Sequence, residues 1–319
     1  MNSNLNKYYD DFMYYMTMER SFSKNTIESY LLDCQRFFDF MEKNYPNITV
    51  ETIETKHFDD FLTKITKKIG NNEEEKLLKA TTKRRIIEGI RAFFKYLIVA
   101  DVINKNPTEL IVTPRLEQRL PIVLSNEEIE RMIATFDVST YSGYRNRLTI
   151  EVLYATGLRV SEFVNLKLSN IIEKENVLNV IGKGDKQRYI PIIDSALEHL
   201  MTYINEYRSQ INIKQKYKDY VFINQKRGTT LTRQFIFNII KQSAIDANID
   251  KKIHPHILRH SFATELIKGG ANIIAVKEMM GHQSVRSTEI YINLSTKELR
   301  NTLFTCHPFY NKAKHSSLF

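Results

Sequence analysis

In the last third of the chain, residues 254–270 read HPHILRHSFATELIKGG. Pro255 suits the first turn of a helix, where its missing N–H leaves no hydrogen bond unmade, and the glycine pair at 269–270 ends that helix. His256 lies close to the helix start and shares one face with Arg259, which follows three residues later. The stretch therefore predicts a helix that presents a histidine and an arginine side by side.

The histidines of this helix also suggest zinc binding as an alternative. His256 and His260 have the i, i+4 spacing of a zinc-binding helix, but no glutamate follows His256 as the H-E-x-x-H motif requires. His254 adds a third ring, yet no cysteine and no motif for a further ligand lies nearby. We therefore expect neither a metal nor another cofactor.

A helix break followed by an arginine marks a second segment, ATGLRVSE at 155–162. Gly157 interrupts one helical pattern and another begins at about Arg159, so Arg159 and Glu162 would share a helix face. A surface ion pair would explain this spacing. An arginine near a helix start is also well placed to bind an anion together with backbone N–H groups.

A third segment shows the clearest β-strand pattern. Alternating β-branched residues at 176–181 and 187–192 flank a glycine-rich turn and predict a β-hairpin. The turn lacks the G-x-x-x-x-G-K-[ST] spacing, which excludes a nucleotide-binding P-loop. Lys183 lies in this turn and Arg188 follows it. A lysine in such a turn is usually solvated, but its ammonium group could also reach a leaving group.

A fourth segment, MGHQSVRSTEIY at 280–291, carries a histidine and a tyrosine. Gly281 would end the preceding helix and leave His282 in a turn. Nine helical residues rotate by about 900°, so His282 and Tyr291 cannot face the same way on one straight helix. They can converge only if the chain turns between them.

Together the four segments hold two arginines, two histidines, one lysine and one tyrosine, without paired carboxylates. This set of side chains could stabilise a pentavalent phosphorane, the species formed when a nucleophile attacks a phosphodiester. It offers cations and hydrogen-bond donors for the non-bridging oxygens, an acid for the leaving oxygen and a phenolic nucleophile. Arginine and lysine would then replace the divalent metal of other phosphoryl transfers.

These four segments, in this order, are similar to the motifs of the tyrosine recombinase (λ-integrase) family, and most closely to its Xer type. A looser match continues through SKNTIESY at 23–30 and RRIIEGIRAFFKYL at 84–97, so the resemblance covers nearly the whole chain. It implies that Tyr291 attacks a DNA phosphodiester and forms a 3′-phosphotyrosyl bond. The freed 5′-hydroxyl would attack the partner duplex, so neither ATP nor metal is required.

The resemblance also implies a role for each further site residue. Arg159 and Arg259 would hold the phosphate, and His282 would add another phosphate contact. Lys183 would protonate the departing 5′-oxygen. His256 would assist proton transfer from the nucleophile and hydrogen-bond the phosphate.

Three positions complete the comparison with the family. Glu162 would support the two arginines. Glu265 and Lys268 lie where the family more often has histidine or apolar residues, and this departure leaves every role in place. The chain from Cys306 onward passes the family's usual stopping point, and its function is open.

The first hundred residues predict helices throughout. Ser23 can cap a helix whose apolar face continues to Met41, and a second apolar stripe covers 86–97. Two less regular stretches, at 4–19 and 55–69, would complete a four-helix unit.

Residues 104–121 are the best candidate for a linker, because they contain three prolines and no sustained hydrophobic periodicity. The helical pattern resumes after Ser125, which can form a capping box with Glu128. With the resemblance, this predicts a mainly α, two-domain clamp on DNA. Its parts would be a SAM-like four-helix core-binding domain at 1–113, a linker at 114–120, and an α-rich catalytic domain with a small β-sheet at 121–319.

Positive charge is concentrated in the second part of the chain. The net charge is +9, from 46 Lys and Arg against 37 Asp and Glu. Residues 1–113 hold 17 of each sign, so the remaining 206 residues carry 29 basic and 20 acidic side chains. A basic half suggests nucleic acid first and an acidic membrane second, with a merely lysine-rich composition as the alternative.

One basic cluster lies at the start of the second N-terminal stripe and consists of Lys83, Arg84 and Arg85. Cations there oppose the helix dipole, so helix stability did not select them. The cluster could be a solvated face or a contact with the phosphate backbone. We assign it, together with Arg188, to DNA binding.

Other features bear on the cellular compartment. The N-terminus has no basic region followed by an apolar core, and no apolar run approaches the roughly 18 residues of a membrane span. Cys34 and Cys306 lie in distant segments, so a disulfide framework is not expected. We expect a cytoplasmic, nucleoid-associated protein without membrane contact.

The resemblance implies assembly on double-stranded DNA at a recombination site. The tetramer would be built from this chain alone or with a paralogous recombinase, and a DNA translocase could activate it. Chromosome-dimer resolution is favoured over a mobile-element integrase, because the front of the chain holds only one DNA-binding domain. A type IB topoisomerase is a further alternative.

Near the C-terminus an apolar stripe is formed by Leu299, Leu303 and Phe304. We hypothesise that this stripe docks into a neighbouring protomer, and the alternative is that it packs on its own domain.

Overall fold

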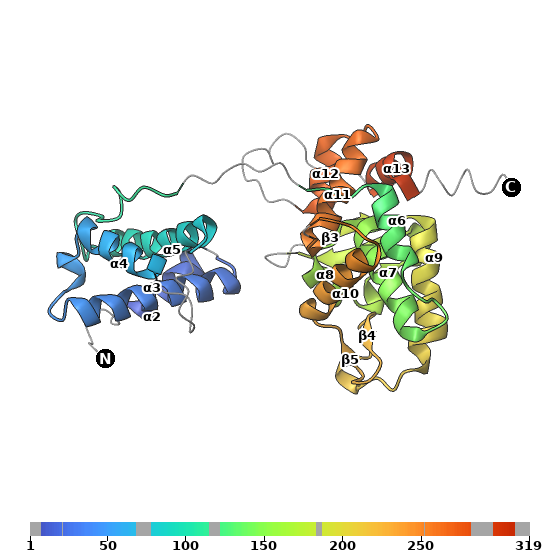
Figure 1. Cartoon of the computed structure of the whole chain (residues 1–319), viewed down its shortest axis with the longest axis horizontal. Coiled ribbons are helices and arrows are strands. Elements are labelled where there is room, and N and C mark those ends of the chain that lie inside the picture. The colour runs from blue at the N-terminus through green and yellow to red at the C-terminus, as the bar shows by residue number, and fades with distance from the viewer. Residues whose placement is uncertain are drawn as a thin grey trace. The chain divides into compact units, whose positions relative to one another are not determined.

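The computed structural model describes residues 8–20, 22–67, 78–114, 122–182, 187–251, 253–281 and 296–309. The chain forms two compact units, Met1–Arg119 and Leu120–Phe319, each with its own hydrophobic core (Figure 1). Within the described residues the fold is mainly α with small sheets, as the sequence predicts. None of the described helices is long and apolar enough to cross a membrane.

The described part of the N-terminal unit is a four-helix arrangement, which confirms the prediction. Ser23 caps the second helix, because its hydroxyl accepts a hydrogen bond from the Thr26 N–H. The elements are α2 (Tyr9–Tyr14) continuing as a π-helix (Tyr15–Glu19), α3 (Lys24–Asn44), a 3₁₀ turn (Val50–Thr52), α4 (Thr55–Lys67) and α5 (Ala80–Val99).

Aromatic side chains fill the core of this unit. Phe37 of α3 stacks on Phe58 of α4 with ring centroids 4.7 Å apart, and Phe94 of α5 meets Phe58 edge to face. None of these three rings is more than 1% exposed. Their burial stabilises the packing of three helices by about 1.5–3 kcal/mol for each ring.

A buried ion pair joins α3 to α5. The Asp33 carboxylate is fully buried, and Arg85 donates hydrogen bonds to both of its oxygens. Gly89, one turn after Arg85, allows the close approach, because a Cβ there would lie 3.2 Å from Asp33 Oδ2. Burial raises the pKa of Asp33 in spite of the charge of Arg85. Arg85 therefore has a structural partner, whereas Arg84 on the same helix is exposed.

The second unit carries most of the helices and all the strands of the described chain. Its helices are α6 (Asn126–Ala134), α7 (Tyr141–Thr156), α8 (Val160–Val164), α9 (Asp194–Thr202), α10 (Arg233–Asp246), α11 (Pro255–Lys268), α12 (Ile273–Met280) and α13 (Thr296–Cys306). Its strands are β1 (Ile171–Ile172), β2 (Val177–Ile181), β3 (Gln187–Pro191), β4 (Ile223–Asn224) and β5 (Thr229–Thr230). The predicted capping box of Ser125 and Glu128 is present at the start of α6.

The predicted β-hairpin is confirmed as β2 and β3, which pair antiparallel with Val180 opposite Arg188. Strand β1 extends this hairpin into a three-stranded sheet of order β1-β2-β3, and β4 pairs with β5 in a second sheet. The sequence did not predict β1, β4 or β5. Each of them has two residues, which is too short for an alternating pattern.

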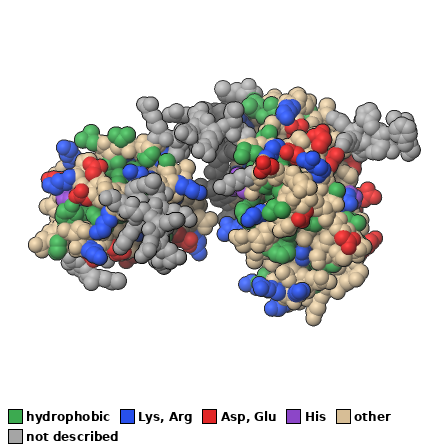
Figure 2. Space-filling model, viewed as in Figure 1, with side chains coloured by type: hydrophobic (Ala, Val, Ile, Leu, Met, Phe, Trp, Pro, Cys, Tyr) green, Lys and Arg blue, Asp and Glu red, His purple; other side chains and the backbone are tan. Residues whose placement is uncertain are grey.

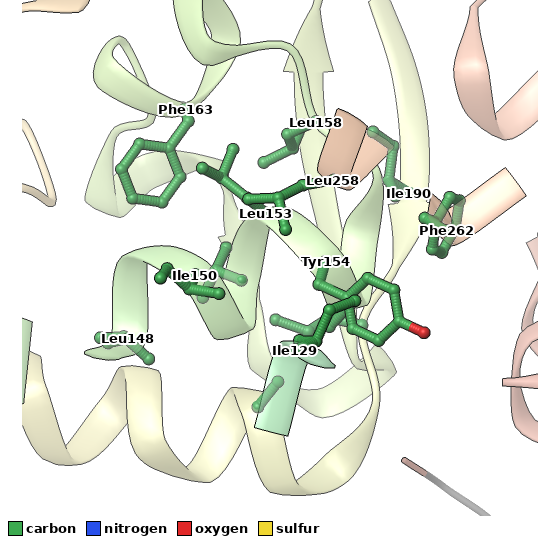
Figure 3. Close-up of a cluster of buried hydrophobic side chains, with 14 of the residues drawn as sticks. Ile129, Leu148, Ile150, Leu153, Tyr154, Leu158, Phe163, Ile190, Leu258 and Phe262 are labelled. Carbon is green, nitrogen blue, oxygen red and sulfur yellow. The ribbon is translucent and has the colours of Figure 1, made fainter. Parts of the chain in front are cut away.

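Helix α7 is the centre of the second core (Figure 3). Every residue from Leu148 to Thr156 is buried, and α6, α9 and α11 pack around the helix. Leu153 and Tyr154 lie among Ile129 of α6 and Leu258 of α11 in this cluster. The buried C-terminal end of α7 gives a rigid base to the turn that follows it.

Helix α13 corrects the expectation of docking in trans. Leu299 and Leu303 of its apolar stripe are buried in the core of their own unit, and Phe304 packs against that core. The helix lies against α11. The stripe is therefore covered in cis, because the core of the same chain offers an apolar surface for it.

Candidate active site

The site begins where α7 ends. Gly157 ends the helix with φ +62°, and a Cβ at this position would lie 2.5 Å from Cδ1 of Phe262 on α11. Only glycine fits both conditions, because it has no Cβ and adopts positive φ freely. The chain then turns, so that Arg159 stands at the N-cap of α8, as the sequence predicts.

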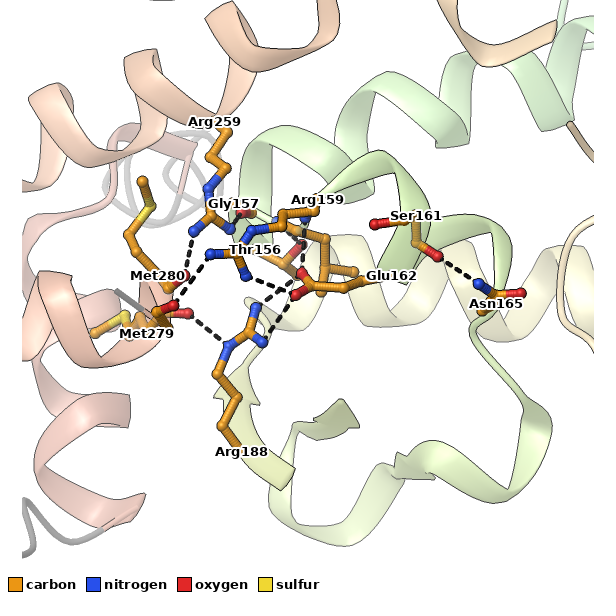
Figure 4. Close-up of polar contacts among 12 residues, drawn as sticks. Thr156, Gly157, Arg159, Ser161, Glu162, Asn165, Arg188, Arg259, Met279 and Met280 are labelled. Carbon is orange, nitrogen blue, oxygen red and sulfur yellow. Dashed lines mark hydrogen bonds and ion pairs between the residues drawn. The ribbon is translucent and has the colours of Figure 1, made fainter. Parts of the chain in front are cut away.

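Arg159 and Glu162 form a close pair at the start of α8 (Figure 4). Arg159 Nη1 donates to Glu162 Oε1 at 2.8 Å, and the backbone N–H of Arg159 donates to Oε2 at 2.8 Å. Arg159 Nη2 reaches the carbonyl oxygen of Gly281 at 3.0 Å. The pair is half-buried and bridges to α12, so it is more than the surface ion pair that its spacing alone would explain.

Arg259 enters from the first part of α11 and is only 6% exposed. It donates to the carbonyl oxygens of Gly157 and Met280. Burial and the nearby charge of Arg159 lower the pKa of Arg259 to about 10, so it remains a cation at neutral pH. Arg259 thereby links the end of α7 to the end of α12.

Arg188 enters from β3, and its side chain is 13% exposed. Its Nη1 and Nη2 donate to Glu162 Oε1 and Oε2 at 2.9 and 2.8 Å, and its Nε donates to the Met279 carbonyl at 3.1 Å. The sequence assigned this residue to DNA binding, whereas its hydrogen bonds here go to protein acceptors. The alternation of side chains along β3 could have indicated that Arg188 points into the protein, because it shares a strand face with the buried Ile190.

The C-terminal end of α12 brings the three arginines together. The carbonyl oxygens of Met279, Met280 and Gly281 each accept a hydrogen bond from a different arginine. Gly281 ends the helix with φ +59°, as predicted from its position after Met280. The negative end of a helix dipole favours cations, which helps to hold these guanidinium groups close together.

The cluster carries a surplus of positive charge. Three guanidinium groups surround one carboxylate, which leaves a net charge of +2 among Arg159, Arg188, Arg259 and Glu162. Burial acts to raise the pKa of Glu162, but the hydrogen bonds and charges of Arg188 and Arg159 outweigh it, so the pKa is lowered. Such a cluster is suited to bind an anion with several acidic oxygens.

A cavity of about 480 Å³ adjoins the cluster. Arg159 and Ser161 line it from α8, and Asn179 and Ile181 line it from β2. Strand β2 leads from this cavity into the turn that holds Lys183. The cavity is therefore lined by an arginine of the cluster and by Gly182, the last described residue before Lys183.

His256 lies at the start of α11, one residue after Pro255, as the sequence predicts. Its side chain is exposed, and its ring lies 6.2 Å from that of His254 between centroids. Within the described residues no group of three His, Cys, Asp or Glu side chains could hold a metal ion. His256 is free to meet a ligand at the surface and lies three residues before Arg259.

Other predicted site residues lie outside the cluster or outside the described chain. Lys83 and Arg84 stand on α5 of the N-terminal unit, where Lys83 is half-buried. Lys183, His282 and Tyr291 fall outside the described residues. The structure thus places Arg159, Glu162, Arg188 and Arg259 in one cluster, with His256 on the helix of Arg259.

Sequence profiles of known families cover most of the chain. The Phage integrase family matches residues 123–298, and the SAM-like N-terminal domain of phage integrases matches residues 9–101. The tyrosine recombinase XerD of Staphylococcus aureus (strain Mu50 / ATCC 700699) is 34% identical over 299 residues. These cover 94% of this chain and 98% of that protein.

Two solved structures share the fold. XerH recombinase bound to difH substrate, in a pre-cleavage complex, has a TM-score of 0.60 at 25% identity and covers 86% of this chain and 78% of that chain. The Tn1549 transposon integrase with circular intermediate DNA has a TM-score of 0.68 at 18% identity and covers 93% and 98%. The family profiles and the match to XerD show that this chain belongs to the phage integrase family and is a site-specific tyrosine recombinase.

Proposed function

We propose that this recombinase binds duplex DNA, cuts it through a 3′-phosphotyrosyl bond to Tyr291 and rejoins the strands with a new partner. The observation that carries the proposal is the net positive cluster of three arginines on the end of α12. The chain continues directly from that helix end into the segment with His282 and Tyr291. A phosphate held by the cluster would therefore lie beside the segment that supplies the nucleophile.

The roles follow from chemistry and position. Arg159 and Arg259 would hold the non-bridging oxygens of the scissile phosphate, with His256 and His282 as further donors. Lys183, in the turn between β2 and β3, would protonate the departing 5′-oxygen. The proposed reaction takes its positive charge from these side chains and needs no metal or other cofactor.

DNA as the substrate is supported by charge and by the relatives. The XerH and Tn1549 integrase structures hold DNA, and the 206 residues after position 113 carry the whole charge excess. Figure 2 shows Lys and Arg side chains gathered at the end of the second unit that carries β4 and β5. We propose domain bounds of 1–113 for the core-binding domain and 121–319 for the catalytic domain.

The finer role would be of the Xer type, namely the resolution of chromosome dimers. The full-length match to XerD supports it, because the alignment leaves only 2% of that protein uncovered. We propose a cytoplasmic protein that acts as a tetramer on DNA, alone or with a paralogous recombinase, under the control of a DNA translocase. A mobile-element integrase is the second candidate, favoured by the fold shared with the Tn1549 integrase.

Covalent trapping tests both the reaction and its target. Wild-type protein is incubated with fragments of host DNA in excess EDTA, denatured, and the DNA that stays attached is sequenced. We expect an adduct at one short site, and Tyr291→Phe should give none while binding DNA with nearly unchanged affinity, because only the nucleophilic oxygen is lost.

A matched control is Tyr14→Phe, which removes a hydroxyl from a tyrosine that is 61% exposed and should leave the adduct yield unchanged. An equal adduct yield from Tyr291→Phe would show that another residue is the nucleophile. Loss of the wild-type adduct in EDTA, restored by zinc, would show that a metal is required. A site near the chromosome terminus would support dimer resolution, and a site at the end of a mobile element would support the integrase.

A further inference from the structure

We infer that Arg188 is a positioning residue for strand cleavage, which fixes Glu162 and the end of α12 so that Arg159 meets the scissile phosphate. This inference rests on the proposed function. It replaces the DNA contact that the sequence suggested for Arg188.

The carboxylate of Glu162 is shared evenly between two arginines. Its Oε1 accepts from Nη1 of both Arg159 and Arg188, and its Oε2 accepts from the Arg159 backbone N–H and Arg188 Nη2. The side chain of Glu162 is only 5% exposed, so water does not replace a lost partner easily. Arg188 therefore holds the carboxylate plane that orients Arg159, and a bidentate pair fixes this plane better than a single bond.

The third hydrogen bond of Arg188 acts on another element. Its Nε donates to the Met279 carbonyl at 3.1 Å, in the last turn of α12. A Cβ at Gly281 would lie 3.2 Å from Cδ, Nε and Cζ of Arg188, so the helix end packs directly on this side chain. One guanidinium thus joins β3, α8 and α12, three elements that lead to Lys183, Arg159 and His282 respectively.

The position of Arg188 argues against a role in DNA affinity. Its guanidinium pairs with both oxygens of a buried carboxylate, whereas Arg259, which is proposed to hold the phosphate, donates only to uncharged carbonyl oxygens. Its planar group faces the two Glu162 oxygens and the Met279 carbonyl. The Glu162 carboxylate therefore already compensates the charge of Arg188, and its Nε has no further N–H to offer a phosphate. The expected consequence of losing Arg188 is a slower chemical step at unchanged DNA binding.

The test compares Arg188→Ala and Arg188→Lys with wild type on the duplex identified by covalent trapping. Single-turnover adduct formation at saturating DNA should slow about 100-fold in Arg188→Ala, the cost of misplacing reacting groups by about 1 Å. Arg188→Lys should stay about 10-fold slow, because one ammonium group cannot hold a carboxylate plane and a carbonyl together. The Kd for the duplex should change less than about threefold, because no phosphate contact is removed.

Arg147→Ala is the matched control. Arg147 also pairs with a mostly buried carboxylate of the same unit, Nε to Glu151 Oε1 at 3.0 Å, and it lies outside the cluster. We expect its adduct rate and Kd to stay within about twofold of wild type. Added guanidinium ion should restore part of the rate of Arg188→Ala and should leave Arg147→Ala unchanged.

A double-mutant cycle with Glu162→Gln isolates the proposed contact. If Arg188 acts through Glu162, the double variant should be little slower than the slower single variant, because the shared interaction is lost only once. If the fold reductions in rate of the two single variants multiply in the double variant, the inference is overturned. A normal cleavage rate, weaker DNA binding and a slope of log Kd against log salt reduced by about 1 would instead show that Arg188 contacts a DNA phosphate.

Failure of the inference can be told apart from failure of the proposed function. An adduct in wild type and an equally fast adduct in both Arg188 variants would overturn the role of Arg188 alone. No adduct in wild type would overturn the proposed function. If Arg188→Ala does not fold, Arg188→Lys carries the test, alone and in the double-mutant cycle with Glu162→Gln.

Discussion

The two units of this recombinase treat a buried carboxylate in opposite ways. In the N-terminal unit Asp33 is fully buried and hydrogen-bonded to Arg85, with the exposed Arg36 3.8 Å away, and burial raises its pKa. In the second unit Glu162 is 8% exposed beside Arg159 and Arg188, and their hydrogen bonds and charges lower its pKa in spite of burial. The nearby positive charge does not offset the burial of Asp33, whereas Glu162 is surrounded by more positive charge than one carboxylate can neutralise.

This difference is the one expected between a structural ion pair and the anion-binding site that we propose. A pair that only joins two helices needs one cation for one anion, and further charge would cost desolvation energy. A site that must receive an external anion keeps cations in excess and holds them apart with protein acceptors. The carbonyls at the end of α12 do this for Arg159, Arg188 and Arg259. Surplus charge in a fixed frame is therefore the observation on which the proposed phosphate site rests.

The largest expected effect is the loss of one surplus cation. Arg159→Ala should slow adduct formation by about 10³-fold or more, in the range seen when a preorganised donor to a transition-state oxyanion is removed. Its thermal stability should change little, because the side chain is 31% exposed and Arg188 still pairs with Glu162. Single-turnover kinetics and thermal melts on the same preparation measure both quantities.

Arg36→Ala in the N-terminal unit is the control, since its side chain is 52% exposed and lies 3.8 Å from Asp33. It should leave the adduct rate unchanged. A large drop in melting temperature for Arg159→Ala with normal cleavage would make the second cluster structural as well, and the contrast between the units would disappear.

Local signals in the sequence predicted the frame of the site. Pro255 begins α11, Gly157 and Gly281 end α7 and α12, and Ser23 and Ser125 cap α3 and α6. Each of these features depends on contacts within about four residues of the chain. For this reason they could be read correctly without knowledge of the tertiary fold.

Contacts between distant segments could not be predicted in the same way. Arg85 meets Asp33 across 52 positions, and Arg188 meets Glu162 across 26, so both arginines resembled free basic residues in the sequence. The cis packing of Leu303 likewise depends on the surface that α11 offers. The identity of the partner decides whether an arginine holds the protein or a ligand, and the partner is a property of the fold.

A second prediction concerns a buried group of the second unit that must remain neutral. His307 is fully buried, its Nδ1 accepts from the Phe309 N–H, and its Nε2 lies 3.4 Å from the Tyr154 carbonyl. The surrounding rings are those of Tyr154, Phe262 and Phe309, none of which is charged near neutral pH. Burial lowers the pKa of His307 to about 4 from its ordinary value of 6.5.

The sign of the pH effect follows from this shift. The unfolded chain binds a proton at His307 below about pH 6.5, whereas the folded chain does so only below about pH 4. The stabilising contribution is present above pH 6.5 and is lost as the pH falls towards 4, by about 3 kcal/mol in total. His307→Phe should flatten this part of the stability curve in urea titrations. An equally steep curve in the variant would assign the acid sensitivity to other groups.

A third prediction breaks the structural pair. Arg85→Ala should lower the free energy of unfolding by about 1–2 kcal/mol, because Asp33 stays buried while the exposure of Arg85, 39%, weakens the pair. Asp33 already binds its proton more tightly in the folded chain, and losing Arg85 raises its folded pKa further. The destabilisation should therefore be greatest near neutral pH and shrink on acidification.

The control on the same helix is Lys95→Ala, which changes an exposed cation and should leave stability within about 0.5 kcal/mol of wild type. The cleavage rate of folded Arg85→Ala at saturating DNA should equal that of wild type. A slower chemical step in this variant would contradict the division between structural and functional arginines.

The smallest expected effect tests what remains of the N-terminal basic cluster. Lys83→Glu with Arg84→Glu removes two cations of α5 and leaves the Arg85–Asp33 pair intact. If both side chains contact phosphates, the slope of log Kd against log salt should fall by about 2, equally for all sequences. The matched control is Lys24→Glu with Lys43→Glu, which makes the same change in net charge at two exposed positions of α3. An identical loss of affinity in both pairs would show that net charge alone acts in this unit. A selective loss in the α5 pair would place a functional surface beside the structural pair, so that a single turn of α5 would hold arginines of both kinds.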